Sequence, residues 1–371
     1  MFSKLATIAL LSSLVGSSAS SESATDPFQM AWEELKPGVW VAHRENSPQL
    51  PVMGNTTVVI HDQGVLVFDG GGVPLWADRV LAKIEQLTSA PVTHVVISHW
   101  HGDHNLGIHR YRERYPAVEF VAHSFTRAAM LGATMDYAKA LPESVATQSE
   151  RYERWLHNGT FDNGSPMAAT DRPWFEAFLD NADLIDREYK GSRITPPTLT
   201  FAEKLVLHLG RRIELLHLGR GNTAGDVALW LPEERILAVG DQVVRPTPYG
   251  GRSYPREWSG ILRHWREVNF DYLVPGHGSV LRDKEYLDLL IETLDSVAEQ
   301  VEGFVARGLS QSEASETLDL SKLESRFTGG DDFLARRFER WFRGPVAVTA
   351  YREVVGEATE VLERPDDGAE N

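Results

Sequence analysis

The chain of 371 residues has a hydrophobic fraction of 42%, which is enough to bury a large core, and its length suggests roughly two domains. The formal net charge of −16 at pH 7 disfavours a nucleic-acid partner, because proteins that bind phosphate backbones gather lysine and arginine on one face. Cysteine is absent, which excludes disulfides and a lipidated cysteine. The composition is that of a globular protein.

The first residues have the pattern of an export signal. Lys4 supplies a positive start, the segment LATIALLSSLVG is apolar but too short for a stable membrane anchor, and SSAS offers small residues for cleavage. We expect residues 1–20 to be a signal peptide and the mature protein to be periplasmic or secreted, with no membrane anchor after cleavage. The alternative is a buried N-terminal helix.

The next part of the chain alternates short strands with a helix. Runs of β-branched and aromatic residues, bounded by glycine, asparagine and aspartate, predict strands at 38–44, 55–62 and 64–71. Residues 74–87 space their apolar side chains at the period of a helix, and the apolar run 92–98 predicts a strand that leads directly into a group of histidines. This order predicts an α/β fold with its chemistry at the carboxyl end of a strand.

The same order of elements recurs later in the chain. Strands are predicted at 204–210, 211–219, 226–232 and 235–244, a helix at 256–268, and a further strand within 272–280. The recurrence predicts two similar halves that face each other.

Two segments lie outside these halves. Residues 130–195 are irregular and rich in aromatic side chains, and we interpret them as a mostly helical insertion that either overhangs a cleft or forms an extra packing layer. Residues 283–363 are predicted to be a helical C-terminal region, in which Ser310 and Glu313 have the spacing of a capping box, and 364–371 a polar, flexible tail. One helix of this region presents an apolar face formed by Leu287, Leu290, Ile291, Leu294, Val297 and Val301.

The segment SHWHGDH contains the strongest chemical signal. His99 and His101 alternate along extended backbone, so their side chains can point the same way, and Gly102 permits a sharp turn that brings Asp103 and His104 to a second position. Imidazole nitrogen and carboxylate oxygen are ligands that zinc prefers. One short loop can therefore serve two metal ions, whereas the alternative is a polar surface loop that happens to be rich in histidine.

This segment resembles the His-X-His-X-Asp-His signature of the metallo-β-lactamase superfamily. One motif before it and two motifs after it also resemble motifs of that family, and they occur in the same order. The other motifs are VFDGGG, which contains Asp69, GDQVV, which contains Asp241, and VPGHG, which contains His277. The resemblance implies an αββα sandwich over residues 30–282 with a dinuclear zinc site at one edge of its two sheets. It also implies that Asp241 bridges the two metals.

The segment GRGNTAGD departs from the family pattern, because Asn222 stands where a histidine usually completes the first metal site. An amide oxygen is a weaker donor to zinc than imidazole, so this site is expected to hold its metal less tightly. His217 could replace the missing histidine only by reaching the metal from further down its strand, and we favour a strand-face histidine. The predicted ligands are His99, His101 and Asn222 at the first site and Asp103, His104, Asp241 and His277 at the second, for one or two Zn²⁺ per chain.

Two of these ligands are also predicted to act in catalysis. Zinc lowers the pKa of bound water toward about 7, which yields a hydroxide nucleophile at neutral pH. We expect Asp103 to steer the water's proton toward the leaving atom, and Asp241 to hold both metals. Asp69 is expected beside the ligands, with a turn-forming aspartate as the alternative, and Thr223 is expected close to them in its loop.

The leading expectation is an exported zinc-dependent hydrolase that acts on a small-molecule substrate. The resemblance to the family implies the broad substrate class, in which an amide, lactone, thioester or ester is opened. A β-lactamase proper is an alternative, although Asn222 would be unusual there. Further alternatives are an iron-containing redox relative, for which no flavin module is visible in this sequence, and a non-catalytic metal-binding or interaction protein.

Overall fold

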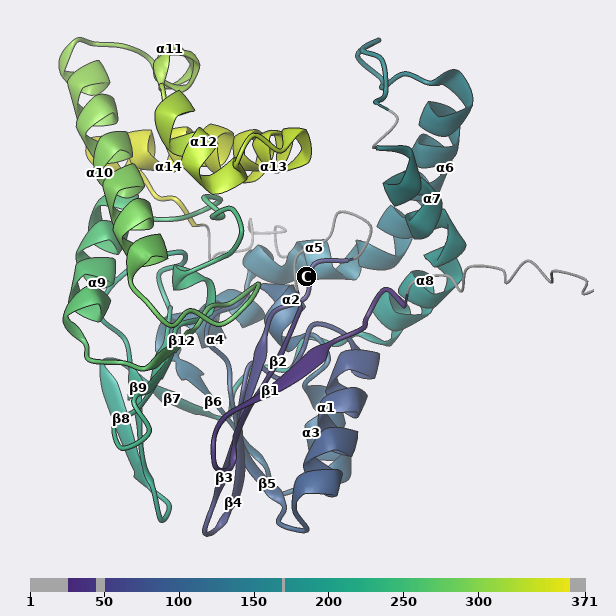
Figure 1. Cartoon of the computed structure of the whole chain (residues 1–371), viewed down its shortest axis with the longest axis vertical. Helices are drawn as coiled ribbons and strands as arrows, with labels where there is room; N and C mark the ends of the chain where they lie inside the picture. Colours follow the sequence, from purple (N-terminus) through teal and green to yellow (C-terminus); the bar gives the residue numbers. More distant parts are fainter. Residues whose placement is uncertain (1–25, 45–50, 169–170, 361–371) are drawn as a thin grey trace, which may run out of the picture.

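The computed structural model describes residues 26–44, 51–168 and 171–360. The predicted signal peptide and the predicted tail both lie outside these residues. Within them, two β-sheets pack against each other and helices cover their outer faces (Figure 1). This arrangement confirms the predicted αββα sandwich.

The first sheet contains the early strands and the second sheet the later ones. The first consists, in spatial order, of β1 (Ala31–Lys36), β2 (Val39–His43), β3 (Thr56–His61), β4 (Gly64–Phe68), β5 (Val92–Val96), β6 (Glu119–His123) and β7 (Leu199–Phe201). Strands β1 to β4 pair antiparallel, and β4 to β7 pair parallel. The second consists of β12 (Tyr272–Val274), β11 (Ile236–Ala238), β10 (Ala228–Leu231), β9 (Arg212–Leu216) and β8 (Lys204–His208), of which only β11 and β12 are parallel. Strands β1, β6 and β7 were not predicted from the sequence.

Helices form the outer layers and two projections. Those of the first half are α1 (Pro74–Leu87), α2 (Gly102–Asn105), α3 (His109–Arg114) and α4 (Ser124–Leu131). Residues 130–195 add η1 (Ala133–Met135), α5 (Asp136–Lys139), α6 (Leu141–Asn158), α7 (Arg172–Asp180) and α8 (Ala182–Gly191). The second half adds η2 (Gly240–Gln242), α9 (Pro255–Glu267), α10 (Glu285–Ala306), α11 (Gln311–Thr317), α12 (Ser321–Thr328), α13 (Asp332–Phe338), η3 (Glu339–Arg343) and α14 (Gly344–Val355). In the part of the chain that is described, no helix has both the length and the apolar character to cross a membrane.

Apolar cores between the layers hold the sandwich together. Leu66 of β4 and Leu229 of β10 belong to the core between the sheets, while Trp76 of α1 packs on the outer side of the first sheet. Strand β4 is buried along its whole length because both faces of the first sheet are covered.

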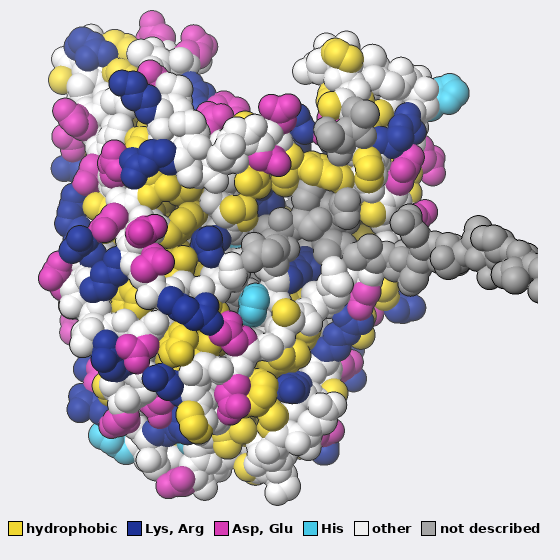
Figure 2. All heavy atoms as spheres, in the orientation of Figure 1, with side chains coloured by type: hydrophobic (Ala, Val, Ile, Leu, Met, Phe, Trp, Pro, Cys, Tyr) yellow, Lys and Arg dark blue, Asp and Glu magenta, His cyan; other side chains and the backbone are white. Residues whose placement is uncertain are grey.

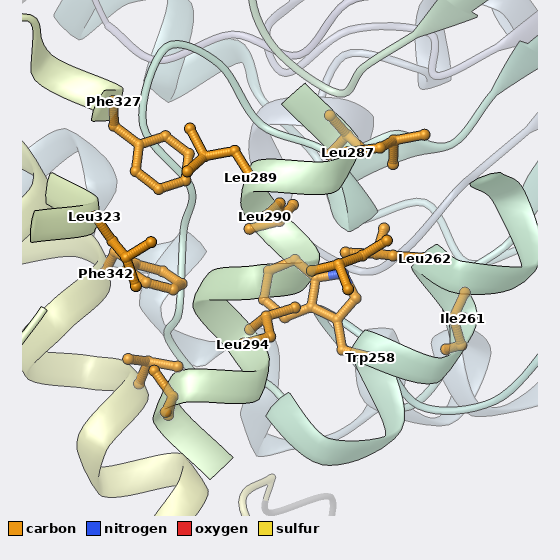
Figure 3. Packing of buried hydrophobic residues seen from close by; sticks show 14 of the residues in the cluster. Trp258, Ile261, Leu262, Leu287, Leu289, Leu290, Leu294, Leu323, Phe327 and Phe342 are labelled. Atoms are coloured by element: carbon orange, nitrogen blue, oxygen red, sulfur yellow. The ribbon is translucent and has the colours of Figure 1, made fainter. Parts of the chain in front are cut away.

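The C-terminal helices pack on the outer side of the second sheet. Trp258 of α9 packs with Leu290 and Leu294 of α10 (Figure 3), and the predicted apolar face of α10 is buried throughout. Helix α11 begins with a complete capping box between Ser310 and Glu313, as predicted. The helical C-terminal region is therefore confirmed.

The helices of residues 130–195 project beside the C-terminal helices. Tyr152, Trp155 and Phe175 form an aromatic cluster within the α6–α7 pair. In the space-filling view this pair and the C-terminal helices stand apart with a hollow between them (Figure 2). Trp174 of α7 nevertheless contacts Phe333 of α13, so the two projections touch.

Candidate metal centre

All the predicted ligand segments meet at one edge of the two sheets. The carboxyl ends of parallel neighbouring strands lie together, and β11 and β12 are such a pair, with Ala238 opposite Val274. Asp241 and His277 each follow three residues after that pair, which brings them side by side. In the first sheet the histidine loop directly follows β5, and it meets Asp241 through His104. The topology explains why two distant parts of the chain form one site.

Asp241 lies between two groups of side chains. Its Oδ1 atom is 3.2 Å from His104 Nε2 and 3.3 Å from His277 Nε2. Its Oδ2 atom is 3.5 Å from His99 Nε2 and 3.8 Å from His101 Nδ1. Each carboxylate oxygen therefore faces a different pair of imidazoles, which is the geometry that a bridging ligand requires.

We call His99 and His101, with the predicted ligand Asn222, the first cluster, and Asp103, His104 and His277 the second cluster. Asn222 is linked to His101 through Tyr249, whose carbonyl oxygen accepts from the Asn222 amide and whose ring packs edge-on against His101. In the second cluster, Asp103 Oδ2 lies 3.1 Å from His277 Nε2 and 3.6 Å from His104 Nε2, and the two histidine Nε2 atoms are 3.2 Å apart. In the first cluster, His99 Nε2 and His101 Nδ1 are 2.8 Å apart. Nitrogen atoms converge in this way where they share a cation or a proton.

Asp69 orients one histidine of each cluster. It follows β4, whose last residue pairs with the end of β5, so its carboxylate lies beside the histidine loop. Its Oδ2 atom accepts a hydrogen bond from His104 Nδ1 at 2.9 Å and another from the Ser98 hydroxyl at 2.7 Å. Because that hydroxyl donates to Asp69, it accepts from His99 Nδ1, 2.8 Å away. Both imidazoles thus turn their Nε2 atoms toward Asp241.

Asn222 is fully buried and is held in a fixed orientation. Its backbone N–H donates to Asp226 Oδ2 at 2.6 Å, and its side-chain Nδ2 donates to the carbonyl oxygen of Tyr249 at 3.0 Å. The remaining Oδ1 atom is buried without a hydrogen-bond partner. An unpartnered buried acceptor costs about 1–3 kcal/mol, and a cation would satisfy it. The amide therefore fits the place of a neutral oxygen ligand.

Thr223 lies inside the same turn. Its hydroxyl donates to Asp226 Oδ1 at 2.6 Å, so it supports the Asn222 turn and does not face the cleft. Burial raises the pKa of Asp226 to about 7 although His99 and these hydrogen bonds oppose the change. No role for Asp226 was predicted from the sequence. Its position in the GRGNTAGD segment, four residues after Asn222, is the sequence feature that could have pointed to it.

His217 stays outside the centre, as we favoured from the sequence. Its Nδ1 donates to the carbonyl oxygen of Asp226 at 2.8 Å, and its ring stacks on His123 with centroids 4.0 Å apart. It therefore does not replace the histidine that Asn222 displaces.

Gly276 shows why the VPGHG motif needs glycine. A Cβ atom at this position would lie only 2.0 Å from Asp241 Oδ1. Any side chain would displace the Asp241 carboxylate.

The electrostatics of the centre favour a cation. Burial disfavours the charged form of His104, but the charges of Asp241 and Asp103 outweigh burial and hold its pKa well above the ordinary value. Burial works against the ionised form of Asp103 in the same way, yet the neighbouring imidazoles hold its pKa well below the ordinary value. The donor set fits zinc. It consists of carboxylates whose negative charge favours a nearby cation, imidazoles that converge, and an amide oxygen without a hydrogen-bond partner.

The sequence matches the model of the metallo-β-lactamase superfamily over residues 50–298, and the chain belongs to this family. The linear primary-alkylsulfatase of Pseudomonas sp. (strain ATCC 19151) is 24% identical over 273 residues, which are 70% of this chain and 48% of that protein. The atrochrysone carboxyl ACP thioesterase of Aspergillus terreus is 27% identical over 86 residues, 23% of this chain and 27% of that protein.

The fold is similar to that of the sec-alkylsulfatase Pisa1 from Pseudomonas sp. The TM-score is 0.56 at 15% sequence identity, over 88% of this chain and 50% of that one. The chain thus spans about half the length of the alkylsulfatases it matches. The family contains enzymes named for several hydrolytic reactions.

Proposed function

We propose that the protein is a metal-dependent hydrolase that cleaves an ester, thioester, lactone or amide in a small molecule, with zinc held by both clusters. The observation that carries this proposal is the position of Asp241, whose two carboxylate oxygens each face one cluster. A divalent cation bound there would supply Lewis acidity and make its water more acidic.

The side chains of the centre have separate roles in this proposal. Asp69 fixes the ring orientation of His99 and His104, so the ligand atoms need little rearrangement when a cation binds. Asp103 is the most exposed charged ligand, with 24% of its side chain accessible. Its depressed pKa keeps it ionised at neutral pH. Its accessible position, not its basicity, suits it to pass a proton from water to the leaving group.

The surroundings favour a substrate with an apolar part. The ring of Tyr249 lies 5.5 Å from the ring of His101, and Trp341, whose residue is 42% exposed, lies 6.1 Å further out. These rings lead from the surface to the first cluster. Because a relative matched over 70% of this chain is named an alkylsulfatase, an alkyl sulfate ester is the second candidate substrate.

Hydrolysis of a substrate panel tests the proposal. The panel contains a primary alkyl sulfate, an activated carboxylic ester, a lactone, a thioester and a β-lactam, each offered to metal-free and zinc-loaded protein. We expect turnover of at least one substrate by the loaded protein, loss on chelation and recovery on adding zinc. Zinc binding without any turnover would favour a metal-binding protein instead, and turnover by metal-free protein would refute the proposal.

We also propose that the protein is exported, on the strength of the apolar segment that follows Lys4. The test is the mass of the mature chain recovered from the periplasm or medium. Cleavage near residue 20 is expected, and an intact N-terminus in the cytoplasm would contradict export.

A further inference from the structure

The chain returns to the metal centre after its last helix. Helix α14 ends at Val355, and Gly356 caps it in the left-handed conformation with a φ of +78°. The following residues run back to the ligand loops, and Glu360 is only 8% exposed there. A buried carboxylate needs hydrogen-bond donors.

Both oxygens of Glu360 are used by loops of the first cluster. Trp100 Nε1 donates to Oε1 at 2.6 Å, and the backbone N–H of Ala224 donates to Oε2 at 2.8 Å. Trp100 stands between the ligands His99 and His101, and Ala224 stands two residues after Asn222. One carboxylate therefore links the histidine loop to the asparagine loop.

Trp100 connects this link to a ligand. Its ring packs edge-on against the ring of His101, with centroids 4.4 Å apart, and the guanidinium of Arg252 lies 5.0 Å above the indole ring. Because Trp100 is 2% exposed, loss of Glu360 would leave its N–H buried without an acceptor, and the ring would have to move. A shift of Trp100 would shift His101.

We propose that Glu360 is a positioning residue for the first cluster, which fixes the distance between the His99–His101 pair and Asn222. The second cluster is oriented mainly by Asp69 and contains its own carboxylate, so it does not depend on this link. The first cluster has only a neutral amide in place of an imidazole, and a weak donor contributes most when it is held in place in advance. The proposal rests on the proposed function only in requiring that both clusters bind a cation.

The test compares Glu360→Ala, Glu360→Gln and a matched control, Glu353→Ala. Glu353 lies in the same C-terminal segment and also accepts hydrogen bonds from two backbone N–H groups, but these belong to Arg256 and Glu257 at the start of α9. Metal-free protein is titrated with Co²⁺ against a chromogenic chelator, and the visible spectrum separates the two binding steps. Thermal unfolding of the metal-free variants is measured in parallel.

We expect the parent to bind Co²⁺ in two steps. Glu360→Ala should weaken the weaker step by about tenfold or more and leave the tighter step within about twofold, as expected for loss of an outer-sphere contact. Glu360→Gln keeps an acceptor, so its affinity for Co²⁺ in the weaker step should lie between those of the parent and Glu360→Ala. Glu353→Ala should change neither step.

Several results would overturn the proposal. These are a single binding step in the parent, an unchanged weaker step in Glu360→Ala, an equal loss in both steps, or the same selective loss in Glu353→Ala. The proposed function fails separately, if two Co²⁺ bind as described but no substrate is hydrolysed.

Discussion

The two clusters share Asp241 but differ in what holds a cation. The second cluster supplies a carboxylate of its own from Asp103, and the raised pKa of His104 reflects the excess of negative charge around it. The first cluster has, as its third predicted ligand, the neutral amide of Asn222, whose Nδ2 is held by Tyr249. Charge favours binding at the second cluster, whereas binding at the first depends on ligand atoms that neighbouring groups hold in position.

This difference indicates which kind of substitution should weaken metal binding at each cluster. The second should suffer most from changes of charge, and the first from changes in distant contacts that set loop spacing.

The largest effect is expected for Asp241→Asn, because both clusters lose their common carboxylate. We expect metal affinity and kcat/KM to fall by more than about 100-fold, which exceeds the about 10- to 100-fold typical of residues outside the ligand set. Metal content and steady-state kinetics measure this. The metal-free variant should still unfold cooperatively; near-normal metal content would contradict a bridging role.

Asp69→Asn should have the next largest effect, since Asp69 reaches His104 directly and His99 through Ser98. We expect an about 10- to 100-fold loss of metal affinity in both binding steps. Ser98→Ala is the matched comparison, because it removes only the connection to His99 and should weaken one step. Identical profiles for the two variants would argue against this division.

Asn222→His should strengthen metal binding at the first cluster, in contrast to the variants above, which weaken it. An imidazole at this position should raise the affinity of the weaker step by about tenfold, and Asn222→Ala should lower it, while the tighter step stays unchanged in both. Competition titration with a chelator measures each step. Unchanged stoichiometry and affinity in both variants would show that the amide does not contact the cation.

The smallest effect is expected in the pH dependence of stabilisation by zinc. In metal-free protein, His104 and His277 have raised pKa values, so their protonation stabilises the folded state. This contribution to the free energy of unfolding is fully present below 6.5, the pKa of histidine in the unfolded chain, and is lost as pH rises through the pKa values of the folded state. The lowered pKa values of Asp103 and Asp241 give stabilisation that is present above 3.8 and is lost as pH falls through the folded values.

Zinc competes with the protons on these imidazoles, so it should stabilise the protein more at pH 8 than at pH 6. Each kcal/mol of added stability should raise the melting temperature by about 1 °C for a protein of this size. Calorimetric scans with and without zinc at both pH values measure the difference. A zinc effect that shrinks as pH rises would contradict the proton competition.

The sequence predicted the elements whose signals are local. The histidine loop, the apolar face of α10 and the capping box of α11 are patterns within short segments, and the structure contains them as expected. The meeting of Asp241 and His277 with that loop followed from resemblance to the family. Parallel pairing of β11 with β12 supplies its physical cause.

Other parts could not be read from the sequence because their partners are far apart in the chain. Strand β7 is three residues long and is defined by pairing with β6, which lies more than 70 residues earlier. Trp100 and Glu360 are separated by 260 residues, and neither belongs to a motif that predicts the other. The orientation of Asn222 likewise depends on a carbonyl oxygen of Tyr249, which has no sequence signature.

Anomalous diffraction at the zinc edge from crystals of zinc-loaded protein would locate the metal ions relative to Asp241. We expect two peaks on either side of the Asp241 carboxylate, the stronger bounded by Asp103, His104 and His277 and the weaker by His99, His101 and Asn222. An absence of any peak within bonding distance of Asp241 would contradict this expectation.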